Sequence, residues 1–267
     1  MIGAQNPAQI GVLSYGARLA ALMRRERQTR YAGGALGYLW AYLTPLFWIA
    51  FVVIAFQILE RVPPVAVAPE LFVATGILPY ILFRQTIASM ARSVQAGRKL
   101  LMIRPIGYGD LMMASAYLEL LNFVILSGVI FASFTLFFDL RPPHDIASLI
   151  LGLGLAWLLG ASFGRFAAVL GLWSDSFARA VPIILRPMFW ASGVFYAAME
   201  MPASAQDWLW FSPLFHAVEI MRSGYFLGYQ SQIAEAWYPF TIATVFFLLS
   251  LVLERWIALR GLRRSGR

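Results

Sequence analysis

Four ionisable side chains interrupt long apolar stretches of this 267-residue sequence: Arg84, Glu119, Arg165 and Arg186. A charge at the centre of a membrane-spanning helix costs about 2.5 to 3.5 kcal/mol on insertion scales, so such residues line polar paths or form ion pairs. Two interpretations stay open. Arg84 and Arg186 could attract an anionic substrate along a polar path, or they could pair with Glu119 or extend to the membrane interface.

Patterns for nucleotide or metal chemistry are missing. The only lysine, Lys99, lies in QAGRKLLM, which lacks the glycine spacing and hydroxyl residue of a phosphate-binding P-loop. His144 and His216 are far apart and have only Asp145 and Glu219 near them in sequence, so we expect hydrogen-bonded or solvated histidines. Cysteine is absent. We therefore expect no catalytic residue, cofactor or metal site in this chain.

Aromatic residues gather near the predicted ends of the apolar segments, where an aromatic belt at the membrane interface is their usual role. A subset could instead stack against sugar rings in a conduit. The best candidates lie on the first and fifth apolar segments: Trp40, Tyr42, Phe189, Trp190 and Tyr196.

The composition indicates an integral membrane protein, because 60% of the residues are hydrophobic and only 13% are charged. About 20 apolar residues in a helix cross a bilayer. The sequence predicts an all-α fold with six such spans: Leu36–Leu59, Leu71–Met90, Met112–Phe138, Ile146–Trp173, Ala180–Tyr196 and Trp237–Ala258. Pro182 and Pro187 predict a kink in the short fifth span.

The charges predict the orientation. With both termini in the cytoplasm, the inner loops hold fifteen cations and four carboxylates, whereas the outer loops hold three cations and eight carboxylates. This asymmetry is typical of the positive-inside rule and explains the net charge of +8 without nucleic acid.

Three segments flank the spans. An interfacial helix is expected over Pro7–Thr29, within a cytoplasmic region 1–34 that precedes the membrane region 35–259 and the basic tail 260–267. The cytoplasmic loop Ser93–Asp110 is basic and amphipathic and could dock a soluble partner. The external loop Ala197–Ala236 contains Trp208–Met221, which is too short and polar to span and predicts one or two helices dipping into the outer leaflet.

The pattern R-x-x-R-Y-x-x-x-x-L-G-Y-L-W-x-x-x-x-P, from Arg27 to Pro45, resembles the start of type-2 ABC export permeases, especially those that export capsular polysaccharide. Three further motifs are similar to that family: Gly76–Tyr80 (GILPY), Ser192–Tyr196 (SGVFY) and Ser212–His216 (SPLFH) continuing to Arg222. The resemblance therefore covers almost the whole chain as one transmembrane domain.

This resemblance implies a bacterial inner-membrane homodimer working with two separate ATP-binding subunits, which hold ATP and Mg. It also implies that Val94–Pro105 is a coupling helix, with ATPase contacts from Val94, Arg98, Lys99, Leu100, Arg104 and Pro105. The N-terminal helix would flank a lateral gate, and the external helices would be re-entrant. Periplasmic and outer-membrane export proteins are further implied partners.

The expected substrate is a lipid-linked, acidic capsular polysaccharide that passes through a conduit between two copies. Arg24, Arg25, Arg27 and Arg30 could recognise a phosphate-bearing lipid terminus, although anionic phospholipids would satisfy the same charges. Permeases for O-antigen, teichoic acid or a small drug would share this architecture. A membrane glycosyltransferase is the alternative from another class, but the outer carboxylates are scattered and form no donor site.

Overall fold

The computed structural model describes residues 15–30, 35–63, 67–97 and 106–265, which form helices and loops without a strand among them. In chain order the elements are α2 (Tyr15–Arg30), α3 (Ala35–Ile58), α4 (Pro69–Ala96), α5 (Tyr108–Phe138), α6 (Ile146–Trp173), α7 (Asp175–Trp190), η2 (Ala198–Glu200), α8 (Ala203–Trp210), α9 (Pro213–Tyr225) and α10 (Trp237–Ser265).

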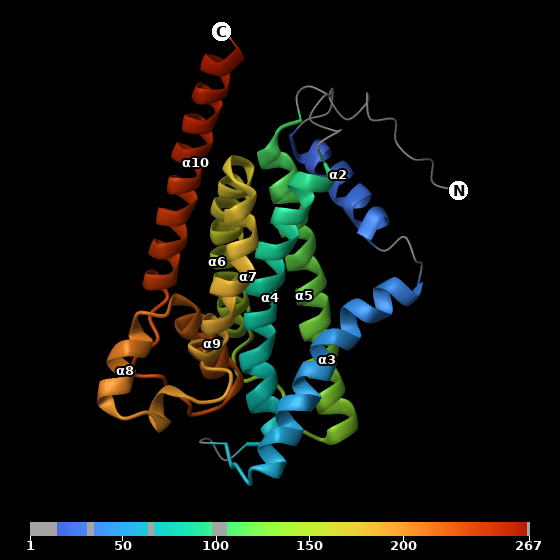
Figure 1. Cartoon of the computed structure of the whole chain (residues 1–267). Coiled ribbons are helices and arrows are strands. Elements are labelled where there is room, and N and C mark those ends of the chain that lie inside the picture. The colour runs from blue at the N-terminus through green and yellow to red at the C-terminus, as the bar shows by residue number, and fades with distance from the viewer. Residues whose placement is uncertain (1–14, 31–34, 64–66, 98–105, 266–267) are drawn as a thin grey trace.

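Figure 1 shows α4, α5 and α6 as a bundle of long helices, with α3 crossing one side and α10 standing on the other. The short helices α8 and α9 gather at the end where α10 begins, and α2 lies at the opposite end, as does the end of α10. The predicted all-α class is therefore confirmed.

Four helices in the described part are long and apolar enough to cross a membrane: α4, α5, α6 and α10, the last over Trp237–Ile257. They correspond to the second, third, fourth and sixth predicted spans. The first predicted span matches α3, which is apolar over Leu43–Ile58. Of the predicted N-terminal helix, residues 7–14 lie outside the described residues, and α2 covers the rest.

The bounds predicted for the fifth span are wrong. Helix α7 begins at Asp175, because the Ser174 side chain accepts a hydrogen bond from the backbone N–H of Ser176 and caps the new helix. It ends at Trp190, and Gly193 then adopts a positive φ of 79° in the turn that follows. Tyr196 therefore lies beyond the helix, in the loop toward η2.

The core is centred on α4, which is buried along most of its length against α6, α5 and α9. Close approach of α4 and α6 depends on small residues. A Cβ atom added at Gly160 would lie 2.8 Å from the Phe83 carbonyl oxygen, and one at Gly164 would lie 2.9 Å from the Ile87 Cα. Gly160-x-x-x-Gly164 is thus a packing face of α6 against α4.

Two ion pairs attach peripheral helices to this core. On α10, Glu254 accepts from the buried Arg165 of α6 at 2.5 Å, and Ser250 accepts from the same guanidinium at 3.0 Å. On α2, Arg30 pairs with Glu119 of α5, while Leu22 packs beside Leu111 of α5. Since both contacts lie near the end that carries α2, this end of the bundle is fixed by charge as well as by apolar packing.

Candidate functional site

An aromatic corner forms where the end of α7 meets α3 and α4. The ring of Phe189 lies 4.8 Å from that of Tyr80 on α4 and 5.8 Å from that of Trp48 on α3, centroid to centroid. Trp190 stacks on Phe195 at 5.1 Å. Offset and edge-to-face contacts at these distances stabilise aromatic clusters. The cluster thus joins three helices at one surface of the molecule.

The loop after α7 completes this corner. The Tyr196 hydroxyl donates to the Trp190 carbonyl at 2.6 Å, and its ring stacks on Phe215 of α9. A Cβ atom at Gly193 would lie 2.7 Å from the Phe215 ring, so the turn requires glycine both for space and for its φ. Of the predicted conduit residues, Phe189, Trp190 and Tyr196 are therefore brought together.

The ring contacts that form this corner do not include the other predicted conduit residues whose side chains are described, Arg84, Arg186 and Trp40. Arg84 is half-buried on α4, with its guanidinium carbon 6.0 Å from the Tyr80 ring centroid. Arg186 is exposed on α7, and Trp40 is exposed on α3. The backbone of Tyr42 belongs to α3, and its side chain lies outside the described part. Glu119 pairs with Arg30, so the interpretation that Arg84 or Arg186 pairs with it is wrong.

One face of α7 carries two exposed arginines. Arg179, Ile183, Arg186 and Trp190 follow one another at spacings of three or four residues, which places them along the same side of the helix. All four are exposed. A helix face with this mixture of charge and aromatic surface is poorly suited to lipid hydrocarbon.

A buried charged network lies directly behind the aromatic corner. Arg222 of α9 is fully buried and donates to the Tyr196 carbonyl at 2.7 Å and to Glu219 Oε1 at 3.2 Å. Its guanidinium carbon lies 4.0 Å from the centroid of the Phe72 ring of α4. The other oxygen of Glu219 accepts from the Tyr229 hydroxyl at 2.5 Å. Burial and the neighbouring carboxylate raise the pKa of the Tyr229 phenol.

This network joins the three motifs that follow the Arg27–Pro45 pattern along the chain. A Cβ atom at Gly76 would lie 3.0 Å from Arg222 Nη2 and 3.0 Å from the Val194 Cα, so the GILPY motif leaves the space that Arg222 occupies. The SGVFY turn supplies the carbonyl acceptors, and the helix after SPLFH supplies Arg222. This role of Arg222 was not predicted from the sequence, although Glu219 and Arg222 at i, i+3 in an apolar helix are a visible signal.

His216 is a structural histidine in the same region. Its Nδ1 accepts from the backbone N–H of Glu235 at 3.0 Å, so Nε2 carries the proton that it donates to the Trp210 carbonyl at 2.8 Å. Burial lowers the pKa of the imidazole. His144 is exposed. Among the residues that the structure covers, no group of three or more metal-ligating side chains occurs.

At the opposite end, the predicted lipid-binding arginines all belong to α2. Arg24 and Arg27 are exposed and Arg25 is half-buried, whereas Arg30 bonds to Glu119 and, at 3.1 Å, to Glu26. Of the predicted coupling residues, Val94 is buried near the end of α4. The remaining ones, Arg98, Lys99, Leu100, Arg104 and Pro105, lie outside the described residues.

Comparisons with known proteins match this chain over most of its length. The family model described as "ABC-2 type transporter" matches residues 17–226. The polysialic acid transport protein KpsM of Escherichia coli is 29% identical over 238 residues, which cover 88% of this chain and 92% of that protein.

Two further relatives carry similar names. The capsule polysaccharide export inner-membrane protein CtrC of Neisseria meningitidis is 27% identical over 87% of this chain and 88% of its own length. The capsule polysaccharide export inner-membrane protein BexB of Haemophilus influenzae is 27% identical, covering 79% and 80% respectively.

Proposed function

Because the chain belongs to the ABC-2 type transporter family, we propose that it is the permease subunit of an ATP-driven exporter that carries lipid-linked capsular polysaccharide across the bacterial inner membrane. The observation that carries this proposal is the similarity to three permeases named for polysialic acid transport or capsule export, over about four-fifths or more of each chain. An acidic polymer is the proposed cargo.

The proposed topology has six crossings with both termini in the cytoplasm. Four helices meet the length and hydropathy of a span, and α3 and α7 supply the other two crossings. The 16 residues of α7 extend about 24 Å, short of a hydrocarbon core of about 30 Å, so its crossing needs the following turn. Helix α2 lies at the inner interface, and α8 and α9 are external re-entrant helices.

The proposed conduit borders the face made by α3 and α7. Support comes from the exposed Arg179 and Arg186, because a lipid-facing position would leave two guanidinium groups beside hydrocarbon. A second copy that closes this face would leave them in a polar passage suited to an acidic polymer. The aromatic corner of Phe189, Trp190 and Tyr196 would then offer stacking surfaces for sugar rings at the outer end of the passage, with Arg84, Trp40 and Tyr42 along it.

Recognition of the lipid terminus is assigned to Arg24, Arg25 and Arg27 of α2, whose guanidinium groups suit a phosphate. Arg30 belongs to the same helix, but its two carboxylate partners give it a different proposed part, which is to hold α2 against α5. The phosphate would therefore meet the exposed side of α2.

Two ATP-binding subunits supply the energy in this proposal, and ATP and Mg bind there. Their proposed docking segment is Val94–Pro105, which contains Arg98, Lys99 and Arg104. Replacing these three cations together by glutamate should abolish co-purification with the ATPase. Unchanged co-purification and transport would remove this assignment.

The function is tested by ATPase stimulation. The permease and its ATP-binding subunit are reconstituted in vesicles, and ATP hydrolysis is measured with acidic capsular glycolipid, with neutral O-antigen glycolipid and with small hydrophobic drugs. Stimulation by the capsular glycolipid supports the proposal. Stimulation by a drug but by no glycolipid contradicts it, as does sugar transfer by the isolated chain.

A further inference from the structure

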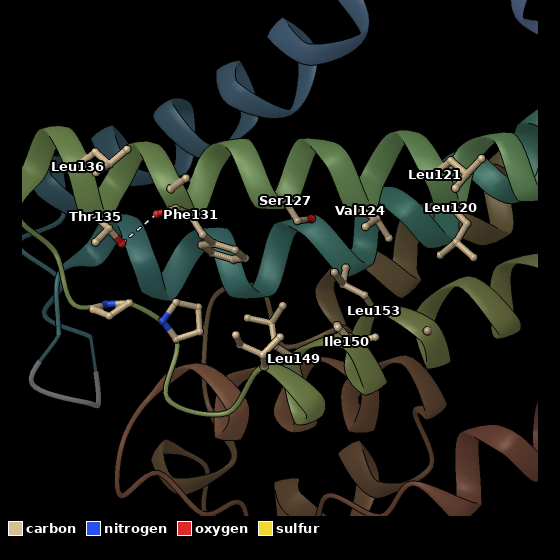
Figure 2. A pocket seen from close by; sticks show the side chains of 16 residues that line it. Leu120, Leu121, Val124, Ser127, Phe131, Thr135, Leu136, Leu149, Ile150 and Leu153 are labelled. Carbon is tan, nitrogen blue, oxygen red and sulfur yellow. Dashed lines mark hydrogen bonds between the residues drawn. The ribbon is translucent and has the colours of Figure 1, made fainter.

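A groove of about 740 Å³ lies between α5 and α6, on residues that the proposed export path does not use. Figure 2 shows that its walls are the second half of α5 and the first half of α6, with Leu120, Val124 and Phe131 facing Leu149 and Leu153. From Leu120 to Leu136 the groove follows α5 for about 24 Å. This length exceeds one leaflet's share, roughly 15 Å, of the hydrocarbon core.

The lining of the groove suits a hydrocarbon chain. Ser127 and Thr135 are its only hydroxyl-bearing lining residues, and the Thr135 hydroxyl donates to the Phe131 carbonyl of its own helix at 3.1 Å. The remaining lining residues are aliphatic side chains, proline, glycine and one phenylalanine. Water molecules in such a groove would find few hydrogen-bond partners, whereas an acyl chain forms no hydrogen bonds and can fill the groove.

Two glycines widen the groove from opposite walls. A Cβ atom added at Gly128 of α5 or at Gly154 of α6 would meet no atom within 4 Å. Helix packing therefore does not explain them, in contrast to Gly160 and Gly164, where a Cβ would collide with α4. Since glycine within a helix costs up to about 1 kcal/mol relative to alanine, open space at both positions is consistent with room kept for a ligand.

At the α5–α6 loop the groove meets a second cavity of about 800 Å³, and Pro142 and Pro143 line both. This second cavity is more polar than the groove, and its lining includes two exposed residues of opposite charge, Asp139 and Arg141. Within the described part of the chain neither of them forms an ion pair. A ligand that fits both cavities carries an apolar chain and a head with one positive and one negative group.

The second cavity is held in shape by the last residues of α9. The Tyr225 hydroxyl donates to the Arg141 carbonyl at 3.0 Å, and the Asp145 N–H donates to the Gly224 carbonyl at 2.7 Å. These bonds fix the loop on both sides of the two prolines, so the head-group cavity is preformed, as most ligand sites are.

We propose that the groove and the cavity together bind one glycerophospholipid with a zwitterionic, amine-bearing head group. Its acyl chain lies between α5 and α6, its phosphate is paired with Arg141, and its ammonium group is paired with Asp139. The site requires only that α5 and α6 span the membrane, so this proposal can be tested independently of the identity of the exported substrate.

The test uses the full-length chain extracted in mild detergent and native mass spectrometry of bound lipid. Phosphatidylethanolamine and phosphatidylglycerol with identical acyl chains are titrated in parallel. Wild type should retain phosphatidylethanolamine in preference to phosphatidylglycerol. Gly128→Phe fills the groove and should abolish retention, while the matched control Val129→Phe, at an exposed neighbouring position outside the lining, should retain the lipid as wild type does.

Substitutions of the two charged residues in the second cavity test their contacts with the lipid head group. A charge near a membrane surface contributes about 1 kcal/mol, which is about fivefold in affinity. Arg141→Gln should therefore weaken both lipids about fivefold, whereas Asp139→Asn should weaken phosphatidylethanolamine alone and so remove the preference.

Three results would overturn the proposal. Equal lipid retention by Gly128→Phe and Val129→Phe rules out the groove, and an unchanged preference in Asp139→Asn rules out the zwitterionic head group. A disulfide between two copies of Gly128→Cys in membranes would show that a second copy covers the groove instead. The natural sequence has no cysteine, so such a crosslink is unambiguous.

Discussion

At the scale of single residues, the most consequential group is Arg222, a fully buried cation that reaches three segments at once. Its position on α9 is set by the helix, but its partners are carbonyls of the turn after α7 and the ring of Phe72. Glu219 neutralises it from one turn earlier. Because the pair is buried, loss of either charge would leave the other unpaired in a medium of low dielectric constant.

We predict that Arg222→Gln lowers the free energy of unfolding by about 3 to 5 kcal/mol, since it leaves Glu219 buried and unpaired. Unfolding in mixed detergent micelles measures this. The matched control is Arg61→Gln, which breaks the partly exposed Arg61–Glu200 pair and should cost about 1 kcal/mol or less. Similar losses in the two variants would contradict the proposed role of the buried network.

His216 makes stability depend on pH. Burial holds the pKa of the folded imidazole below its ordinary value of 6.5, so below pH 6.5 the unfolded chain binds a proton before the folded chain does. Stability should therefore be unaffected above that pH and should fall as the pH decreases below it.

Melting temperatures measured at pH 7.5 and pH 5.5 test this prediction. The pH-dependent loss should be smaller in His216→Gln and unchanged in His144→Gln, because His144 is exposed. An identical loss in wild type and His216→Gln would assign the effect to other groups.

The sequence indicates which charged residues lie in apolar segments, but it does not indicate which residues they pair with. Arg84, Glu119, Arg165 and Arg186 were visible as charges in apolar segments. The partners are Arg30 for Glu119 and Glu254 for Arg165, each 89 residues away, and helix periodicity carries no information over that separation. Glu219 and Arg222 were assigned to an external loop by charge counting, because burial of a short helix against α4 and α6 depends on tertiary packing.

At the scale of elements, the contact between α4 and α6 depends on glycine. We predict that Gly160→Ala destabilises the protein by about 1 to 3 kcal/mol, because the new methyl group would meet the Phe83 backbone at 2.8 Å. Gly154→Ala on the same helix meets open space and should be neutral or slightly stabilising. The free energies of unfolding of the two variants, measured in the same detergent, test this difference. Equal effects would contradict this packing.

The attachment of α2 is a second element-scale prediction. Glu119→Gln removes the charged partner of Arg30, and a hydrogen bond to a charged group contributes about 1.5 to 3 kcal/mol. Helix α2 should open more often, so trypsin cleavage after Arg24, Arg25 and Arg27 should be about tenfold faster or more. Glu254→Gln breaks a pair that does not involve α2 and should leave this rate unchanged. Equal acceleration in both variants would contradict the role of the Arg30–Glu119 pair in holding α2 against α5.

Helix existence could be read from hydropathy, whereas some helix ends could not. The predicted span Ile146–Trp173 coincides with α6, because the side chain of Asp145 caps its start and the side chain of Ser174 caps the start of α7 directly after it. The fifth span was misplaced because hydropathy excluded Arg179 from the helix and included the turn at Gly193. In α7 the capping serine and the positive-φ glycine decide the ends.

At the scale of the whole molecule, the protein has two unlike sides. The α5–α6 side presents an apolar groove, while the α7 side exposes arginine and aromatic surface that a bilayer would not accommodate well. In the proposed transporter the first side faces lipid and the second faces another copy across the conduit. Composition and charge asymmetry predicted the membrane location, but only the packed helices separate these two sides.

The central claim is that this chain forms a passage for a lipid-linked acidic polysaccharide and depends on a separate subunit for ATP hydrolysis. It is tested most directly in sealed vesicles that contain the permease and its ATP-binding subunit. The measurement is the fraction of lipid-linked capsular polymer that becomes accessible, on the side away from the ATPase, to a depolymerase that cannot cross the membrane. The account predicts that this fraction rises only with ATP and only when both subunits are present. Transport or ATP hydrolysis by this chain alone, or no translocation by the complete complex, would contradict it.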